Sequence, residues 1–407
     1  MAQRLLRYIK VGVIVVFISS DLVAQNVRYI DSTNFSSQKD IIDVFRELKI
    51  FNQRVEEKPD RLNKKLRLSV LPTVSPAQGA TGLVFVTAFT ATFLLGDPQT
   101  TNASNIYFIP YTNFDGKFVF PIRSYIWTKN NKWNFIGDYK YLIYPETTYG
   151  LGSGSNKNEA SLVNYKHIRF YQSVLRNVFS YLVMGGGVHF DHHYDIQEEL
   201  LNEKYNHVLQ YDGAGITATQ SNGLSFTSAF DSRLNSLNPQ QGMYAGVMYK
   251  YIPTWMGSTS NWKSLYADIK LYHSFNRKRQ NIISFWSFYW DVFAGKAPYL
   301  DLPSTAWDPS YRSGRGYYQG RFRGDAMAYI ESEYRFDLTQ NGLWGATVFA
   351  NAQSLRNPST RNFEKIAPGV GAGLRLKFNK FSNTNLTFDV AVGSESWNYY
   401  FGIGEFF

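Results

Sequence analysis

The stretch AYIESEYRF, residues 328–336, alternates apolar and polar side chains with a period of two. One predicted face carries Ile330, Tyr334 and Phe336, and the other carries Tyr329, Glu331, Glu333 and Arg335. Successive side chains of a strand point to opposite sides of a sheet. This stretch therefore predicts a β-strand with one apolar and one charged face.

The same alternation recurs to the last residue. About sixteen segments show it, at 67–76, 82–96, 104–113, 116–128, 132–143, 164–176, 178–192, 215–231, 242–254, 260–275, 280–294, 326–337, 341–353, 367–378, 383–394 and 397–407. A water-soluble sandwich can show such alternation too. Segments of about ten residues, an even count and aromatic residues near strand ends favour an all-β, 16-stranded antiparallel transmembrane β-barrel.

Composition narrows the function classes. The 407 residues include no cysteine, which excludes disulfides and thiolate chemistry. No apolar run reaches the ~18 residues of a spanning helix, so any membrane residence must use strands. The formal charge is +10, but the cations are scattered, which argues against nucleic-acid binding.

The first 65 residues differ from the rest. Residues 1–24 combine basic residues, a short apolar core and a cleavage site after Ala24, which predicts a signal peptide. Residues 25–65 form a polar periplasmic segment with one predicted helix near residues 38–51. Residues 66–407 form the barrel.

Four stretches in order resemble the BamA/TamA-type bacterial surface antigen superfamily, which includes outer-membrane protein insertases and two-partner secretion transporters. They are GLSFTSAFDSRLNSLNPQQGMYAGV (223–247), GRGYYQGRFRGD (314–325), IESEYRF (330–336) and YYFGIGEFF (399–407). A fainter fifth, KLRLSVLPTVSPAQGATGLVF (65–85), looks like the opening hairpin. Residues 25–65 are too few for a complete POTRA module, so the resemblance implies a barrel-only member.

The resemblance implies that the long loop before residue 326 folds back into the lumen. Arg315 is then the arginine that docks on the inner wall, with Gly316 allowing close approach, Tyr317 packing beside it and Glu333 as the matching carboxylate. A buried guanidinium needs such acceptors. Asn351 stands where the family usually has an aspartate, and we expect it to accept a hydrogen bond from Arg315.

Other residues of this region leave alternatives open. Arg321 and Arg323 are rival donors in the same loop. Because Asn351 carries no charge, the anchor could be looser than is usual in the family or could use Glu331 or Asp325 instead. The choice of Arg315 rests on the motif alone.

Two further sets of residues come from the resemblance and from strand chemistry. The mid-barrel motif comprises Asp231, Arg233, Asn235, Pro239 and Gly242. The predicted seam between the first and last strands comprises Pro72, Gly402, Gly404 and Phe407. Proline lacks a donor and glycine weakens strand order, so this seam should hold few hydrogen bonds. An alternative is that these residues only relieve curvature where the barrel closes.

The implied function is outer-membrane protein insertion and assembly, or protein translocation, with membrane lipid and client or partner proteins as contacts. The alternative is a non-catalytic subunit that scaffolds a larger outer-membrane complex, or a passive pore. An enzyme is not expected: HFDHHYDIQEE, at 189–199, could bind a divalent metal through His189, Asp191 and His193, but a polar strand end near the outer rim explains it better. We expect no metal, cofactor or nucleic acid.

Overall fold

The computed structural model describes residues 38–47, 66–76, 83–97, 100–112, 116–201, 205–233, 235, 238–275, 281–380 and 383–407. The predicted signal peptide lies outside the described residues, as does residue 48 onward of the predicted helix. Within the described ranges, no helix has the length and apolar character needed to cross a membrane.

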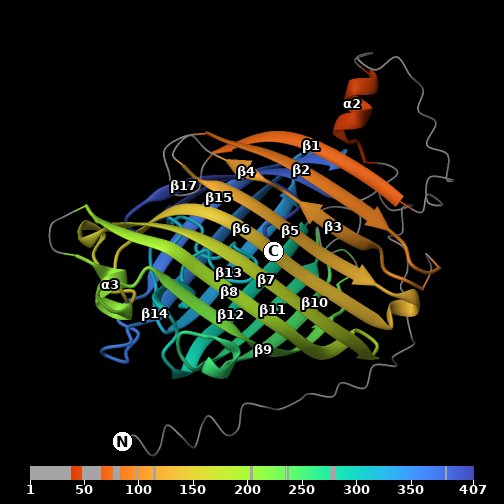
Figure 1. The fold of residues 1–407 in the computed structure, drawn as a ribbon. Helices are drawn as coiled ribbons and strands as arrows, with labels where there is room; N and C mark the ends of the chain where they lie inside the picture. Colours follow the sequence, from red (N-terminus) through yellow and green to blue (C-terminus); the bar gives the residue numbers. More distant parts are fainter. Residues whose placement is uncertain are drawn as a thin grey trace, which may run out of the picture.

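The fold is an all-β barrel (Figure 1). Its strands are β1 Leu66–Pro76, β2 Leu83–Phe93, β3 Ser104–Phe108, β4 Tyr111–Thr112, β5 Phe118–Trp127, β6 Trp133–Thr148, β7 Ser161–Phe179, β8 Leu182–Leu200, β9 Ala218–Asp231, β10 Gly242–Ile252, β11 Trp262–Ser274, β12 Asn281–Gly295, β13 Ala326–Asp337, β14 Trp344–Arg356, β15 Ala367–Asn379, β16 Thr384–Gly393 and β17 Trp397–Ile403. The helices are α2 Ile41–Glu47, α3 His207–Asp212 and the 3-10 turns η4 Lys129–Asn131, η5 Lys157–Glu159, η6 Thr254–Met256 and η7 Tyr299–Asp301.

Strands β3 and β4 are two parts of one wall strand. Both pair with β2 on one side and with β5 on the other. Pro110, which has no backbone N–H, lies in the break between them. Counted this way the barrel has sixteen strands, and the predicted number is confirmed.

Consecutive strands pair antiparallel around the wall, from β1–β2 to β16–β17. The first and last strands are the exception. The described residues show no ladder between β1 and β17, although the two strands approach each other. Each therefore has one edge without a strand partner.

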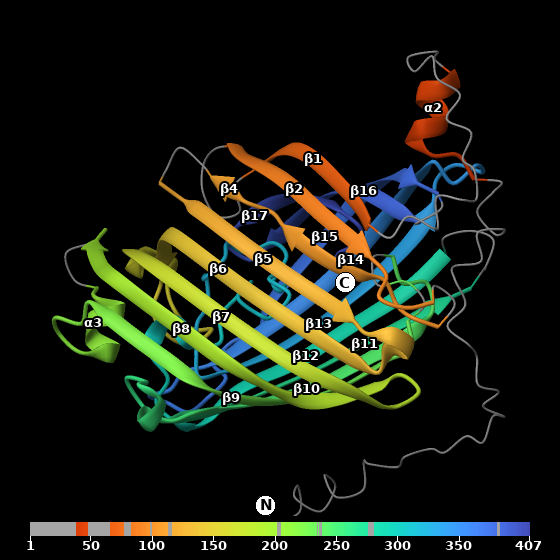
Figure 2. The same ribbon diagram turned by 45° about the vertical axis from the view of Figure 1, so that its right-hand side comes forward.

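The barrel has a long-loop end and a short-turn end. The connection between β12 and β13, residues 296–325, belongs to the long-loop end, and the two-residue turn between β7 and β8 belongs to the other. Helices α3 and α2 lie at opposite ends (Figures 1 and 2). Helix α2 is held at the short-turn end, outside the lumen, by Lys380, which donates to Asp40 from its backbone and to Asp43 from its side chain.

The wall separates apolar from charged side chains as the alternation predicts. In β13, Ile330 is 46% exposed on the outer surface, whereas Glu331 is fully buried inside. Buried arginines and carboxylates from β13, β15 and β16 face the lumen in the same way. Around these strands the interior is thus packed and largely polar.

Several predicted strand ends were wrong. Strands β6 and β8 continue past the predicted ends at 143 and 192, where Glu146 accepts from Trp307 and His193 lies 3.8 Å from Asp301 of the β12–β13 loop. Strand β7 ends at Phe179 rather than at residue 176, next to the short turn to β8. The last strand ends at Ile403 rather than at residue 407. Gly404 has φ +83°, a left-handed conformation that ends the strand.

Candidate functional site

The β12–β13 loop folds into the lumen, where Arg315 lies fully buried against the wall. Its guanidinium donates to Glu331, to Glu333 at 2.5 Å and to Asp389 at 3.0 Å. The same group lies over the ring of Phe349, 3.3 Å from its centroid. The expected contact of Arg315 with Glu333 is present, and two further carboxylates join it.

The balance of burial and charge keeps this arginine ionised. Burial by itself would lower the pKa of Arg315, but the carboxylates of Glu331, Glu333 and Asp389 raise it above its ordinary value. Two other arginines also pair with these carboxylates. Arg335 donates to Glu333 at 2.5 Å, and Arg375 donates to Asp389 at 2.5 Å. The cluster is a network rather than a single pair.

Backbone geometry places the arginine. Gly316 has φ +102°, and a Cβ on it would lie 2.8 Å from the backbone of Val392 and Gly393. The Gly316 N–H donates to the Tyr400 hydroxyl at 2.9 Å. Tyr317 packs over Gly393 and donates to the Pro368 carbonyl at 2.6 Å. Only glycine fits this approach to the wall.

The predicted direction of the hydrogen bond between Asn351 and Arg315 was wrong. Its Nδ2 donates to the backbone carbonyl of Arg315 at 2.9 Å, and its Oδ1 has no hydrogen-bond partner. The guanidinium points instead to Glu331, Glu333 and Asp389, which are charged and better acceptors. Asn351 therefore holds the backbone of the loop, not its cation.

The rival arginines have other partners. Arg321 donates to Glu395 and to Ser155, and Arg323 donates to Glu146 at 2.9 Å. Asp325, considered as an acceptor for Arg315, pairs with Arg356 at 2.7 Å and with Arg361 at 2.9 Å. Arg315, Arg321 and Arg323 thus attach the loop to three different parts of the barrel.

The mid-barrel motif lies at the short-turn end. Arg233 donates twice to Asp231, at 2.8 Å each, and Asn235 accepts from the backbone of residue 238 at 3.3 Å. Gly242 starts β10 with φ +102°. The carbonyl of Pro239 accepts from Arg335 at 3.4 Å. The motif shapes the β9–β10 turn and touches the arginine network only through Pro239.

The predicted seam residues divide into two groups. Pro72 lies in β1 opposite Thr87 of β2, and Gly402 lies in β17 opposite Thr387 of β16. Phe407 was predicted to belong to the last strand and to its seam, but the strand ends at Ile403. Phe407 is 7% exposed and lies inside the barrel, because Gly404 redirects the chain.

The histidine-rich stretch also faces inward. His189, Asp191 and His193 share the inner face of β8, as predicted, but in its middle rather than at the outer rim. Asp191 accepts from Arg169 at 2.8 Å and contacts His167 at 2.7 Å. Within the described part of the chain, no group of three such ligands could hold a metal ion.

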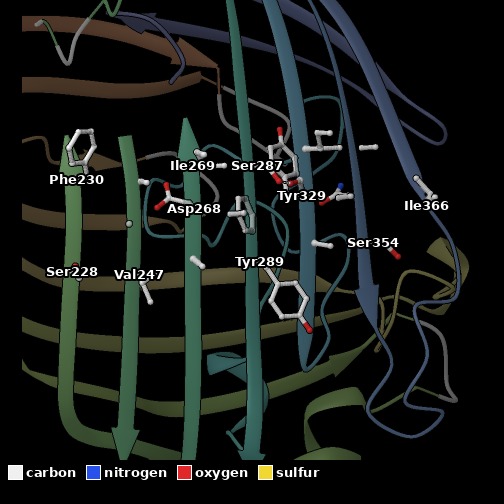
Figure 3. Close-up of a pocket in the computed structure, with 18 of the residues that line it drawn as sticks. Ser228, Phe230, Val247, Asp268, Ile269, Ser287, Tyr289, Tyr329, Ser354 and Ile366 are labelled. Atoms are coloured by element: carbon white, nitrogen blue, oxygen red, sulfur yellow. Dashed lines mark hydrogen bonds between the residues drawn. The ribbon is translucent and has the colours of Figure 1, made fainter. Parts of the chain in front are cut away.

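The described wall also has an outward depression of about 730 Å³ across β9 to β14. Figure 3 shows the lining residues, which include Val247, Ile269 and Tyr289 and the small side chains of Ser287 and Ser354. These residues lie on the outer phase of their strands. The depression is therefore a shallow hollow on the outer face of the wall and does not belong to the lumen.

Several lumen residues were not singled out from the sequence. Asp389, Arg375 and Arg335 were on predicted polar faces, so the strand period placed them inward without saying which charges meet. Glu405 gave no signal, because it was assigned to a regular last strand.

No protein-family model matches the chain, and no curated protein does. Solved structures do. BamA from Haemophilus ducreyi lacking POTRA domains 1–3 is 14% identical, with a TM-score of 0.55 over 83% of this chain and 70% of that one. CdiB from Acinetobacter baumannii is 12% identical, with a TM-score of 0.53 over 84% of this chain and 60% of that one. CdiB from Escherichia coli is 10% identical, with a TM-score of 0.58 over 84% and 62%.

At these identities the likeness concerns the fold. The chain has a barrel of the type seen in BamA and CdiB, as the sequence resemblance implied. It spans less than two thirds of the length of both CdiB chains.

Proposed function

We propose that this protein is an outer-membrane barrel that acts on other polypeptides, in membrane insertion and assembly or in translocation, through the seam between β1 and β17. The observation that carries the proposal is the missing ladder between these two strands, since all other neighbouring strands of the described wall pair. An unpaired strand edge presents backbone donors and acceptors that another strand can use.

The membrane location is part of the proposal. The outward side chains of the strands are apolar and exposed, including Leu68, Val348 and Phe401. A wall with this surface and a polar, packed interior suits a bilayer. Its fold is also that of BamA and CdiB, and the resembled family includes insertases and transporters.

The packed lumen supports this proposal over a passive pore. Arg315, Arg321 and Arg323 each attach the β12–β13 loop to the wall, and the last residues of the sequence lie beside it. These contacts fill a part of the lumen that a passive pore would need to keep open. A scaffolding role in a larger complex is the remaining alternative.

The test is to close the seam covalently. The chain has no cysteine, so Leu68→Cys with Phe401→Cys places two unique outward thiols on β1 and β17. A short bismaleimide should block insertion of an unfolded barrel protein into proteoliposomes. The matched control is Ser332→Cys with Ala350→Cys, which are opposite each other on the paired strands β13 and β14.

Cross-linking the control pair should leave insertion unchanged. Equal activity of the seam-linked and unlinked proteins would refute the seam as the working element. Insertion that is absent even without cross-linking would favour the scaffolding alternative.

A further inference from the structure

The hollow across β9 to β14, which we call the outer hollow, has the volume of a binding pocket. It measures about 730 Å³, and pockets that bind small molecules hold ~300–1,000 Å³. A single row of paired, outward-facing residues crosses it, one from each strand: Phe230, Ala245, Ile269, Ser287, Ile330 and Ala352.

The length and direction of the outer hollow match one lipid chain. Five strand spacings of ~4.8 Å make the row about 24 Å long. It starts near the long-loop end, at Ser354 and Ile366, and runs toward Phe230 near the short-turn end (Figure 3). Because barrel strands tilt by ~35–45°, a line across them descends by about 14–17 Å through the membrane. This is about half of the ~30 Å hydrocarbon core, which is the depth of one leaflet.

The floor of the outer hollow suits a methylene chain. Its serine hydroxyls already have partners in the protein, since Ser287 donates to the Tyr329 carbonyl at 3.0 Å and Ser354 donates to the Lys365 carbonyl at 2.7 Å. Small side chains such as Ala267 make the floor low. A hydrocarbon chain can therefore cover these serines without leaving their hydroxyl groups unpaired.

Charged residues stand at the long-loop end of the outer hollow. Lys365 directly precedes Ile366 and is exposed. Arg361, in the same connection between β14 and β15, is 65% exposed. Its partner Asp325 also pairs with Arg356 at 2.7 Å, so this carboxylate is shared between two cations.

The other acidic residues of this margin have partners of their own. Asp291 pairs with Arg356 at 2.7 Å, and Glu364 accepts from Asn357 and Thr360 of its own loop. Exposed cations beside a membrane attract anionic headgroups, and phosphate oxygens accept charge-assisted hydrogen bonds from them. The margin therefore complements a phosphate at the point where the outer hollow begins.

We propose that the outer hollow binds one acyl chain of an anionic, phosphate-bearing lipid from the leaflet on the long-loop side, whose phosphate meets Arg361 and Lys365. This inference rests on the proposed membrane location, but not on the proposed action at the seam. The outer hollow includes neither β1 nor β17, so the bound lipid is a resident of the wall and not a client.

The first experiment fills the outer hollow. Ala267→Phe with Ala328→Phe places two rings on either side of Tyr289. The matched control is Ala350→Phe with Ala372→Phe, at exposed outward positions outside the lining. Native mass spectrometry in detergent micelles measures the binding of added dimyristoylphosphatidylglycerol. The unsubstituted protein and the control should each retain one lipid, and the filled variant should bind it at least tenfold more weakly.

The second pair of variants tests the headgroup. Arg361→Gln with Lys365→Gln should weaken binding of this lipid about tenfold and leave that of dimyristoylphosphatidylcholine unchanged. The control Lys157→Gln with Lys166→Gln removes two cations elsewhere at the long-loop end and should change neither.

Three results would overturn the proposal. They are equal lipid binding by the filled variant and its control, equal affinity of the unsubstituted protein for the two lipids, and a dimer that only the filled variant loses. The last result would assign the outer hollow to a second copy of the chain.

A fluorescence measurement covers a filled variant that does not fold. Ala350→Cys, two positions from Ala352, carries a bimane label beside the outer hollow, and Ile168→Cys carries it on the distant strand β7. In phosphatidylcholine bilayers with a small fraction of nitroxide-labelled phosphatidylglycerol, the label at position 350 should be quenched at least twofold more. Equal quenching would overturn the proposal. None of these assays measures insertion, so their failure is distinguishable from a failure of the seam experiment.

Discussion

Replacing Arg315 by methionine is the sharpest test of the lumen network. The substitution keeps an unbranched apolar chain but removes the charge that contacts Glu331, Glu333 and Asp389. Glu333 retains Arg335 as a partner, and Asp389 is likewise still paired. Glu331 is therefore the carboxylate that loses its only charged partner among the described residues.

Glu331 keeps only the Tyr329 hydroxyl as a side-chain partner when the arginine is removed. Breaking a buried ion pair costs about 3–5 kcal/mol, because the remaining charge stays desolvated. That range corresponds to a roughly 150- to 4,000-fold larger open population of the β12–β13 loop. The barrel should remain heat-modifiable, since the strand ladders are untouched.

The assay is the rate of proteolytic cleavage within residues 296–325 under conditions where the loop opens and closes faster than it is cut. The matched control is Arg361→Met. Arg361 also pairs with a carboxylate, at 2.9 Å from Asp325, but its side chain is 65% exposed. Exposed pairs are worth ~0–1 kcal/mol, so this variant should be cut at nearly the native rate.

Second substitutions show which carboxylate is left unpaired by Arg315→Met. Adding Glu331→Gln to Arg315→Met should restore more protection than adding Glu333→Gln, because the latter leaves Arg335 without its carboxylate at 2.5 Å. Equal cleavage of Arg315→Met and Arg361→Met would refute the anchoring role. Better rescue by Glu333→Gln would refute the assignment of the unpaired charge.

Three other substitutions have defined outcomes. Gly316→Ala should strongly raise the rate of loop cleavage, because the new Cβ would lie 2.8 Å from the backbone of Val392 and Gly393. The matched control is Gly116→Ala, where φ is +85° but nothing lies within 4 Å of the Cβ; it should cost only about 1 kcal/mol in thermal stability. Tyr317→Phe loses the 2.6 Å hydrogen bond to a carbonyl and should increase cleavage about fivefold, or ~1 kcal/mol. Burial and the charge of Asp191 raise the pKa of Asp301 to about 7, above its ordinary 3.8, so the stability of the loop should fall as the pH rises from about 4 through 7. Asp301→Asn should flatten that dependence in hydrogen exchange, and an unchanged profile would contradict the assignment.

The sequence by itself determined the wall of this barrel. Alternation in stretches such as 328–336 depends only on the two-residue period of a strand, and each strand carries that pattern locally. The number of strands, the inward face of Glu331 and Glu333, and the outward face of Ile330 therefore agree with the structure. The motif around Arg315 also identified the loop arginine that reaches the inner wall.

The tertiary structure decided which charges meet inside. Arg315 is 74 residues from Asp389, and Arg323 is 177 residues from Glu146. No local period encodes such pairs, because they depend on how the loop enters the barrel. The direction of the Asn351 hydrogen bond has the same origin.

The tertiary structure also decided where the last strand ends. Tyr399 and Phe401 keep the outward phase, but Gly404 adopts φ +83° and Phe407 turns inward. A glycine permits both an extended and a left-handed backbone at little cost. The buried Arg335 and Arg375 around Glu405 select between them, and the two arginines come together only when β14 pairs with both β13 and β15.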